Sequence, residues 1–190
     1  MAAQTSRDKK KKNVVDALNR ARGMELNAIT QYMNHHYNLA NMDYGDMAAK
    51  LKLIAIDEMR HAEMFAERVK ELGGEPTTQA AAKPKQDGEV TFIFEADTKL
   101  EDGAIDSYNA FQQICRESGD SISAKLLEAI IDDEQVHFNY FDSVREHIAR
   151  LGETYLAQIA GTPSSTGIQY QGFVVRQSGS TQGGGAGPGA

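Results

Sequence analysis

The chain has 190 residues, enough for one domain with a substantial core, and its formal net charge of -7 argues against nucleic acid or an anionic membrane as a partner. Its single cysteine, Cys115, excludes an internal disulfide and a cysteine-rich metal site, and it favours a reducing cytoplasm. No segment has the roughly 20 apolar residues of a membrane span, and we expect no export signal.

Five helices are predicted from hydrophobic spacing and from helix start and stop signals. In chain order their expected ranges are 13–40, 43–72, 90–119, 121–151 and 153–160. Asp43 and Ser121 are the expected N-caps of the second and fourth helices, and Gly73 follows the second as a stop. The prediction is an all-α domain over 13–160: an antiparallel four-helix bundle with a long crossover at 77–88 and a short fifth helix.

Three segments need separate interpretation. Residues 1–12 contain a run of lysines and are expected to form a basic N-terminal arm. Residues 161–190 are rich in Gly and Ser and are expected to form a flexible C-terminal tail. Val90–Phe94 has the composition of a strand, but its apolar residues continue with helical spacing as far as Tyr108, so it is interpreted as the start of the third helix.

The chain contains an internal repeat with an offset of 76 residues. Four pairs of identical residues define it: Glu25 and Glu101, Tyr32 and Tyr108, Glu58 and Glu134, and His61 and His137. In each half the two glutamates are equidistant from the turn of a helical hairpin, so they should face each other deep in the bundle. Within each Glu-x-x-His the two side chains lie about 60° apart around the helix, so both can reach one metal ion.

This pattern predicts a dinuclear metal centre. Four buried carboxylates without partners would be very costly, and two divalent cations would cancel their charge. Carboxylate and imidazole ligands suit iron or manganese, and zinc would bind without redox chemistry. One Glu-x-x-His alone would be weak support, but two with matching upstream glutamates are specific.

The residues around this centre allow two readings each. Tyr32 and Tyr108 are equally consistent with core packing and with support of the ligands. Asp57 and Asp133 precede the motif glutamates, and they either face solvent or orient the ligand histidines. His35 is expected, like its neighbour His36, to be a bundle or surface residue outside the metal centre.

At these positions the chain resembles the bacterioferritins, most of all those of sulfate-reducing bacteria. The resemblance covers about residues 13–160. The matching motifs are Met24–Ile29 with Gln31-Tyr32, Ile56–Glu63, Asp133–His137 and Tyr155–Ile159. It implies a ferritin-like fold and a cytoplasmic homo-oligomer of dimers assembled into a hollow shell of 24 subunits. It also implies that Fe(II) is oxidised by oxygen or hydrogen peroxide and stored as an Fe(III) mineral, with an unknown electron donor for iron release.

The resemblance also implies roles for individual residues. Two iron ions per subunit would be bridged by Glu58 and Glu134. Glu25 and Glu101 would be terminal ligands, and His61 and His137 would each bind one iron. Met59, whose repeat partner is Gln135, matches the methionine by which this family holds a haem shared between two subunits. Some members of the family have an inner-surface histidine that binds a further iron; Leu53 occupies that position here, which argues against a third iron site.

Two alternatives belong to other classes. A rubrerythrin-like di-iron peroxidase or oxidase usually has a cysteine-rich electron-transfer domain, which one cysteine cannot build. A haem electron-transfer protein with a vestigial di-iron site is disfavoured because all six ligands are present. Mini-ferritins with an intersubunit site are disfavoured because both halves of the centre lie in one chain.

Overall fold

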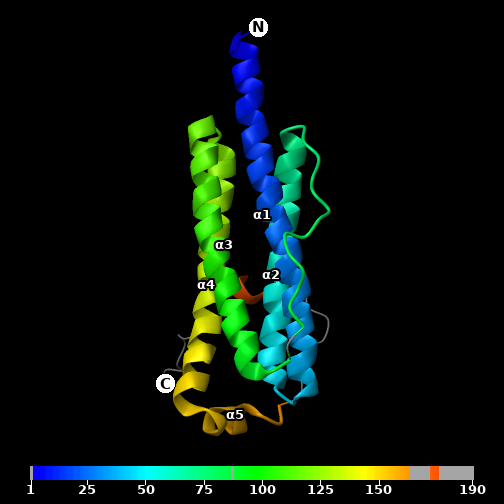
Figure 1. The fold of residues 1–190 in the computed structure, drawn as a ribbon, viewed down its shortest axis with the longest axis vertical. Helices are drawn as coiled ribbons and strands as arrows, with labels where there is room; N and C mark the ends of the chain where they lie inside the picture. Colours follow the sequence, from blue (N-terminus) through cyan, green and yellow to red (C-terminus); the bar gives the residue numbers. More distant parts are fainter. Residues whose placement is uncertain (1, 87, 163–171, 176–190) are drawn as a thin grey trace, which may run out of the picture.

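The computed structural model describes residues 2–86, 88–162 and 172–175, and Figure 1 shows its helices. Four helices longer than 25 residues are followed by a short one: α1 Ala2–Asn41, α2 Gly45–Glu71, α3 Val90–Ser118, α4 Ser121–Leu151 and α5 Glu153–Ile159. The predicted all-α bundle with a long crossover and a short fifth helix is confirmed. In the described part of the chain, no helix is long and apolar enough to cross a membrane.

The four long helices form two antiparallel hairpins, α1 with α2 and α3 with α4 (Figure 1). The crossover between α2 and α3 runs back along the bundle, so that α3 starts at the end where α2 also starts, and α5 lies across that end. The crossover is fastened to α1: the side chain of Asn19 bonds to Thr77 N, and that of Gln31 bonds to Lys85 N and O. The two hairpins are thereby held in register.

The helix ends correct some expectations. The first helix begins at Ala2 rather than near Asn13, so the basic segment is part of α1, whose first turns extend beyond the other helices (Figure 1). Asp43 was expected to cap α2, but it has a φ of 61° in the turn, and Tyr44 is the N-cap. Asp120, not Ser121, caps α4, and its side chain accepts a hydrogen bond from the backbone N of Ser123.

The core consists of two apolar clusters, one on each side of a buried polar layer. Along α1 the residues Val14–Ala21 belong to one cluster and those from Ala28 onward to the other, with Glu25 between them. The same order, or its reverse, recurs on α2, α3 and α4, where Glu58, Glu101 and Glu134 separate the clusters. Each long helix therefore brings one carboxylate to the same level inside the bundle.

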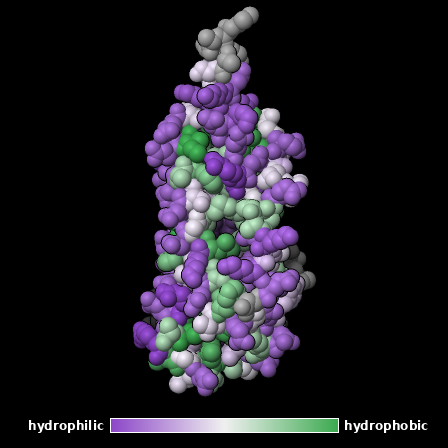
Figure 2. Space-filling model, in the orientation of Figure 1, coloured by the Kyte–Doolittle hydropathy of each residue, from purple (hydrophilic) through white to green (hydrophobic). Residues whose placement is uncertain are grey.

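The outside of the bundle is mainly polar, as the face in Figure 2 shows. Cys115 lies fully buried in the cluster with Val14 and Phe65. Few large apolar side chains are exposed in the described residues, and Met59, on α2, is one of them at 50%. Most of the predicted tail, residues 163–171 and 176–190, lies outside the described residues. Residues 172–175 do contact the bundle, which the composition of the tail does not predict.

Candidate metal centre

Six side chains from the four long helices converge in the polar layer between the two apolar clusters. They form two groups of possible metal ligands that share Glu58 and Glu134. One group is completed by Glu25 and His61, and the other by Glu101 and His137. In each group the candidate ligand atoms lie within 4.8 Å of one another. The structure thus brings together all six residues that the repeat predicted.

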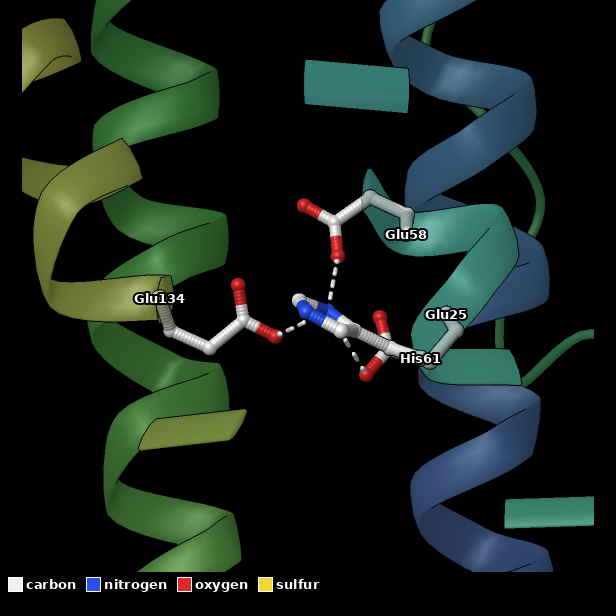
Figure 3. Close-up of side chains that lie close together, drawn as sticks. All are labelled: Glu25, Glu58, His61 and Glu134. Atoms are coloured by element: carbon white, nitrogen blue, oxygen red, sulfur yellow. Dashed lines mark hydrogen bonds and ion pairs between the residues drawn. The ribbon is translucent and has the colours of Figure 1, made fainter. Parts of the chain in front are cut away.

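The ring of His61 lies between the carboxylates of Glu25, Glu58 and Glu134 (Figure 3), and His137 has the same kind of surroundings in the other half. His61 Nδ1 is 3.0 Å from Glu58 Oε2 and 3.3 Å from Glu134 Oε1. His137 Nδ1 is 3.0 Å from Glu134 Oε2 and 3.1 Å from Glu58 Oε1. The terminal carboxylates are farther away: Glu25 Oε1 is 3.8 Å from His61 Nδ1, and Glu101 Oε1 is 3.9 Å from His137 Nδ1. The two halves of the centre are nearly symmetrical.

All six side chains are buried, with exposures of 2% or less. Glu58 Oε1 and Glu134 Oε1 are buried and lie near a histidine Nδ1, but the geometry gives neither oxygen a hydrogen bond. Buried carboxylate oxygens are normally satisfied, because leaving one unpaired costs roughly 1–3 kcal/mol or more. These two oxygens therefore fit metal ligands, since a cation between them would supply the missing partner.

The electrostatics of the centre separate the four glutamates into two kinds. Burial raises the pKa of Glu25 well above its usual value, and the carboxylates of Glu134 and Glu58 raise it further. The same causes raise the pKa of Glu101. Burial acts against ionisation of Glu134 too, but His61 and His137 outweigh it and lower its pKa to about 2. His137 and His61 likewise lower the pKa of Glu58 against the effect of burial.

The histidines are affected in the opposite sense. Burial lowers the pKa of His61, but Glu134, Asp133 and Glu58 outweigh it and raise the pKa well above its usual value. Glu58 and Asp57 do the same for His137. Without metal, these shifts favour imidazolium cations at His61 and His137, carboxylates at Glu58 and Glu134, and protonated carboxyls at Glu25 and Glu101. In that protonation state the six side chains carry no net charge. Metal cations can bind when they displace these protons.

Tyr32 and Tyr108 both pack in the core and support the glutamates, so each of the two readings holds. Tyr32 donates a hydrogen bond of 2.5 Å to Glu101 Oε1, and Tyr108 donates one of 2.7 Å to Glu25 Oε1. Burial raises the pKa of both phenols well above 10, so they remain donors. Each tyrosine supports the terminal glutamate of the other half, which ties α1 to α3 at the centre.

Asp57 and Asp133 contact the histidines of the opposite hairpin, as expected of residues that orient these rings. Asp133 Oδ2 lies 3.3 Å from His61 Nε2, and Asp57 Oδ2 lies 3.5 Å from His137 Nε2. A carboxylate on Nε2 directs Nδ1 toward the glutamates, and metal-binding histidines commonly have such a partner on the ring nitrogen that does not bind the metal. The two environments differ, because the Asp133 side chain is 39% exposed and that of Asp57 only 5%.

A small cavity of about 20 Å³ opens on the glutamates between α1 and α3, and its lining includes Tyr32 and Tyr108. It has room for about one water molecule.

His35 and His36 lie outside both ligand groups, as expected. His35 Nδ1 is 2.9 Å from Asp97 Oδ2, and His36 Nδ1 contacts Ala48 O. Burial raises the pKa of Asp97 to about 6, with His35 opposing that shift.

Sequence reasoning missed one group of residues near the centre. Gly172, Phe173 and Val174 contact Asp57, and they were assigned to a flexible tail. The available signal was local: Phe173-Val174-Val175 is an apolar run inside a segment of Gly, Ser, Thr and Gln. The buried pair His35–Asp97 was also not foreseen, because Asp97 has no counterpart in the other half of the repeat, where Ala21 stands.

Four long helices around two glutamates and two Glu-x-x-His motifs define a ferritin-like protein. Residues 15–172 match the family model described as a ferritin-like domain. The bacterioferritin of Desulfovibrio desulfuricans is 56% identical over 169 residues, which are 89% of this chain and 94% of that protein. Bacterioferritin BfrA of Mycobacterium tuberculosis is 34% identical over 80% of this chain and 96% of its own length.

Solved structures agree with these relatives. The X-ray structure of the Desulfovibrio desulfuricans bacterioferritin describes a di-iron site in different catalytic states. It matches this chain with a TM-score of 0.84 at 56% sequence identity, and the match covers 88% of this chain and 98% of that one. The crystal structure of BfrA from M. tuberculosis has a TM-score of 0.75 at 33% identity, covering 80% and 97%. The chain belongs to the bacterioferritin family of iron-storage proteins.

Proposed function

We propose that this protein binds two ferrous ions per chain in the centre described above, oxidises them and stores the ferric product. The proposed ligands are Glu25, Glu58, His61, Glu101, Glu134 and His137. The observation that carries the proposal is the pair of ligand groups sharing Glu58 and Glu134, each of which has one buried oxygen without a hydrogen bond. The di-iron site of the Desulfovibrio relative supports iron as the metal.

The arrangement gives each ligand a role. Glu58 and Glu134 belong to both groups, so they would hold both ions as bridging carboxylates. Glu25 and Glu101 each belong to one group, so they are terminal, and the tyrosine hydrogen bonds hold them in place. Bound iron supplies the one-electron chemistry, with oxygen or hydrogen peroxide as the acceptor. The side chains bind and orient the ions, and they release to solvent the protons that the ions displace.

The ferroxidase activity is tested by removing both bridges. The double variant Glu58→Ala with Glu134→Ala should lose the rapid phase of Fe(II) oxidation. The oxidation is measured in air from the rise in ferric absorption. The control is Glu63→Ala with Glu128→Ala, which removes two exposed carboxylates from the same two helices. Unchanged initial rates of Fe(II) oxidation in the first double variant would refute the ferroxidase role of this centre.

Storage requires a compartment, and we propose that the chain assembles as dimers into a hollow shell of 24 subunits in the cytoplasm. The family membership supports this assembly, and the polar outer face in Figure 2 is compatible with a shell surface. Sedimentation and electron microscopy of the purified protein should show particles of 24 chains that gain a dense core after iron loading. Stable dimers that never form closed particles would contradict the storage role. Iron release would need an electron donor that remains to be found.

We propose that Met59 binds haem at the twofold interface of a dimer. Its side chain is 50% exposed on α2, while Glu58 beside it is buried, so the thioether is directed away from the iron ligands. A symmetric interface would bring two copies of Met59 together, which supplies both axial ligands from one residue per chain. The thioether fits such a group, because it is exposed and belongs to neither apolar cluster of the described residues.

Substitution of Met59 separates haem binding from assembly. Met59→Leu keeps the apolar volume, so the shell and the ferroxidase rate should persist while the low-spin haem spectrum disappears. Met64→Leu is the matched control, because Met64 is also on α2 and is 36% exposed. A native haem spectrum in Met59→Leu would mean that another residue holds the porphyrin.

A further inference from the structure

The C-terminal segment 172–175 lies against the centre on the His137 side only. In Figure 1 it is the short red segment halfway along the bundle, between α4 and α2. The backbone N–H of Phe173 donates to Asp57 Oδ2 at 2.5 Å, and that of Val174 donates to the same oxygen at 3.1 Å. That oxygen also lies 3.5 Å from His137 Nε2, so the segment acts on the ligand histidine through Asp57.

The side chains of this segment reinforce the contact. Phe173 is 3% exposed, and its ring lies 6.3 Å from the ring of His137 and 5.2 Å from that of Tyr140. A Cβ at residue 172 would lie 1.6 Å from Asp57 Oδ1, so only glycine permits this approach. Asp57 cannot move aside cheaply, because its carboxylate is also hydrogen-bonded to Arg60 and to two backbone amides.

The other half of the repeat has a different environment. The counterpart of Asp57 is Asp133, whose side chain is 39% exposed although it contacts His61 in the same way. The counterpart of Tyr140 is Met64, which is 36% exposed. Water can therefore reach the carboxylate behind His61, whereas Phe173 and the backbone amides cover the one behind His137. The segment breaks the symmetry of an otherwise symmetrical centre.

We propose that residues 172–175 make the two metal sites unequal, by holding Asp57 fixed behind His137 and excluding water there, so that the metal on the His137 side is released more slowly than the metal on the His61 side. The inference rests on the proposed dinuclear centre. The reason is mechanical: loss of a ligand histidine requires its ring to rotate, and the ring of His137 is fixed by a carboxylate that is itself held by two amides. Among the described residues, the carboxylate behind His61 is that of the half-exposed Asp133. Phe173 and Gly172 are thus positioning residues.

The test uses the full chain loaded with Co(II), whose visible absorption reports the bound ion without oxidation chemistry. Release to an excess of chelator is followed by stopped flow. The unaltered protein should bind two Co(II) per chain and release them in two phases of similar amplitude. In Phe173→Ala the slow phase should become roughly 10-fold faster, while the fast phase stays unchanged. This is the lower end of the effects seen when a residue that supports a metal-binding histidine is altered. Gly172→Val should have the same effect by blocking the approach to Asp57.

Two controls assign the phases. Val175→Ala alters the exposed end of the same segment and should leave both phases unchanged. Asp133→Asn should accelerate the fast phase only. A single release phase in the unaltered protein, or an unchanged slow phase in both Phe173→Ala and Gly172→Val, would overturn the inference. Failure to bind two Co(II) would instead refute the proposed dinuclear centre, so the two failures are distinguishable.

Discussion

Metal binding to this centre should release about four protons per chain near neutral pH. The raised pKa values of His61 and His137 favour imidazolium cations without metal, and the raised pKa values of Glu25 and Glu101 favour protonated carboxyls. Each of the four must lose its proton to become a ligand. Because the metal competes with these protons, affinity should rise with pH. Four protons for two ions correspond to roughly a 100-fold gain in affinity per ion for each pH unit.

Zinc is the suitable probe, because it binds carboxylate and imidazole ligands without redox chemistry. Protons released on addition of two Zn(II) per chain can be counted directly by pH-stat titration, and the affinity can be followed by calorimetry between about pH 6 and 8. Glu101→Gln removes one dissociable proton and should release about three. Glu128→Gln, whose parent side chain is 59% exposed on α4, is the control and should still release about four.

The number of protons released discriminates between two sets of protonation states for the metal-free centre. If the glutamates and histidines were held in their ordinary protonation states, nearly all of the carboxyls would already be ionised at pH 7 and the histidines largely neutral. Binding would then release about one proton or none. A count of one or fewer, or an affinity that does not change with pH, would refute the charge balance deduced from the buried contacts.

Three further predictions follow from individual contacts. Tyr108→Phe removes the hydrogen bond to Glu25 and should weaken Co(II) binding by roughly 10-fold, measured by competition with a chelator, whereas unaltered affinity would leave Tyr108 a packing residue only. Asp57→Asn should reduce the Fe(II) oxidation rate by about 10–100-fold without changing particle size. Asp120→Ala removes the N-cap of α4 and the paired hydrogen bonds to Arg68. The free energy of unfolding, measured by denaturant titration of the metal-free protein, should therefore fall by about 2–3 kcal/mol. A loss below about 0.5 kcal/mol would contradict this role.

The repeat made the ligand set predictable, because equal spacing from a hairpin turn fixes the height of a residue on both helices. Glu25 and Glu58 therefore could be paired from their numbers alone. The same symmetry argument could not reach Asp97 or Phe173, which have no equivalent in the other half. The contact between Asp57 and Phe173 joins residues 116 positions apart, and nothing in local propensity encodes such a contact.

The errors at helix ends have local causes. The lysines at 9–12 are good helix formers, and the segment between Ala2 and Asn13 holds no Gly or Pro, so α1 continues through it although its charge suggested a separate arm. At the start of α4, Asp120 and Ser121 are both acceptable caps by residue type. The structure selects Asp120, whose carboxylate also pairs with Arg68. A tertiary partner decided between two locally equivalent choices.

The burial of Cys115 has a consequence for the durability of the protein. Burial raises the pKa of its thiol to about 11, and Asp120 contributes to that shift. Reaction with peroxide or with another thiol needs the thiolate, so this sulfur is inert at ordinary pH. The protein thus offers oxidants no reactive sulfhydryl, and neighbouring chains should not become cross-linked by disulfides as the protein ages.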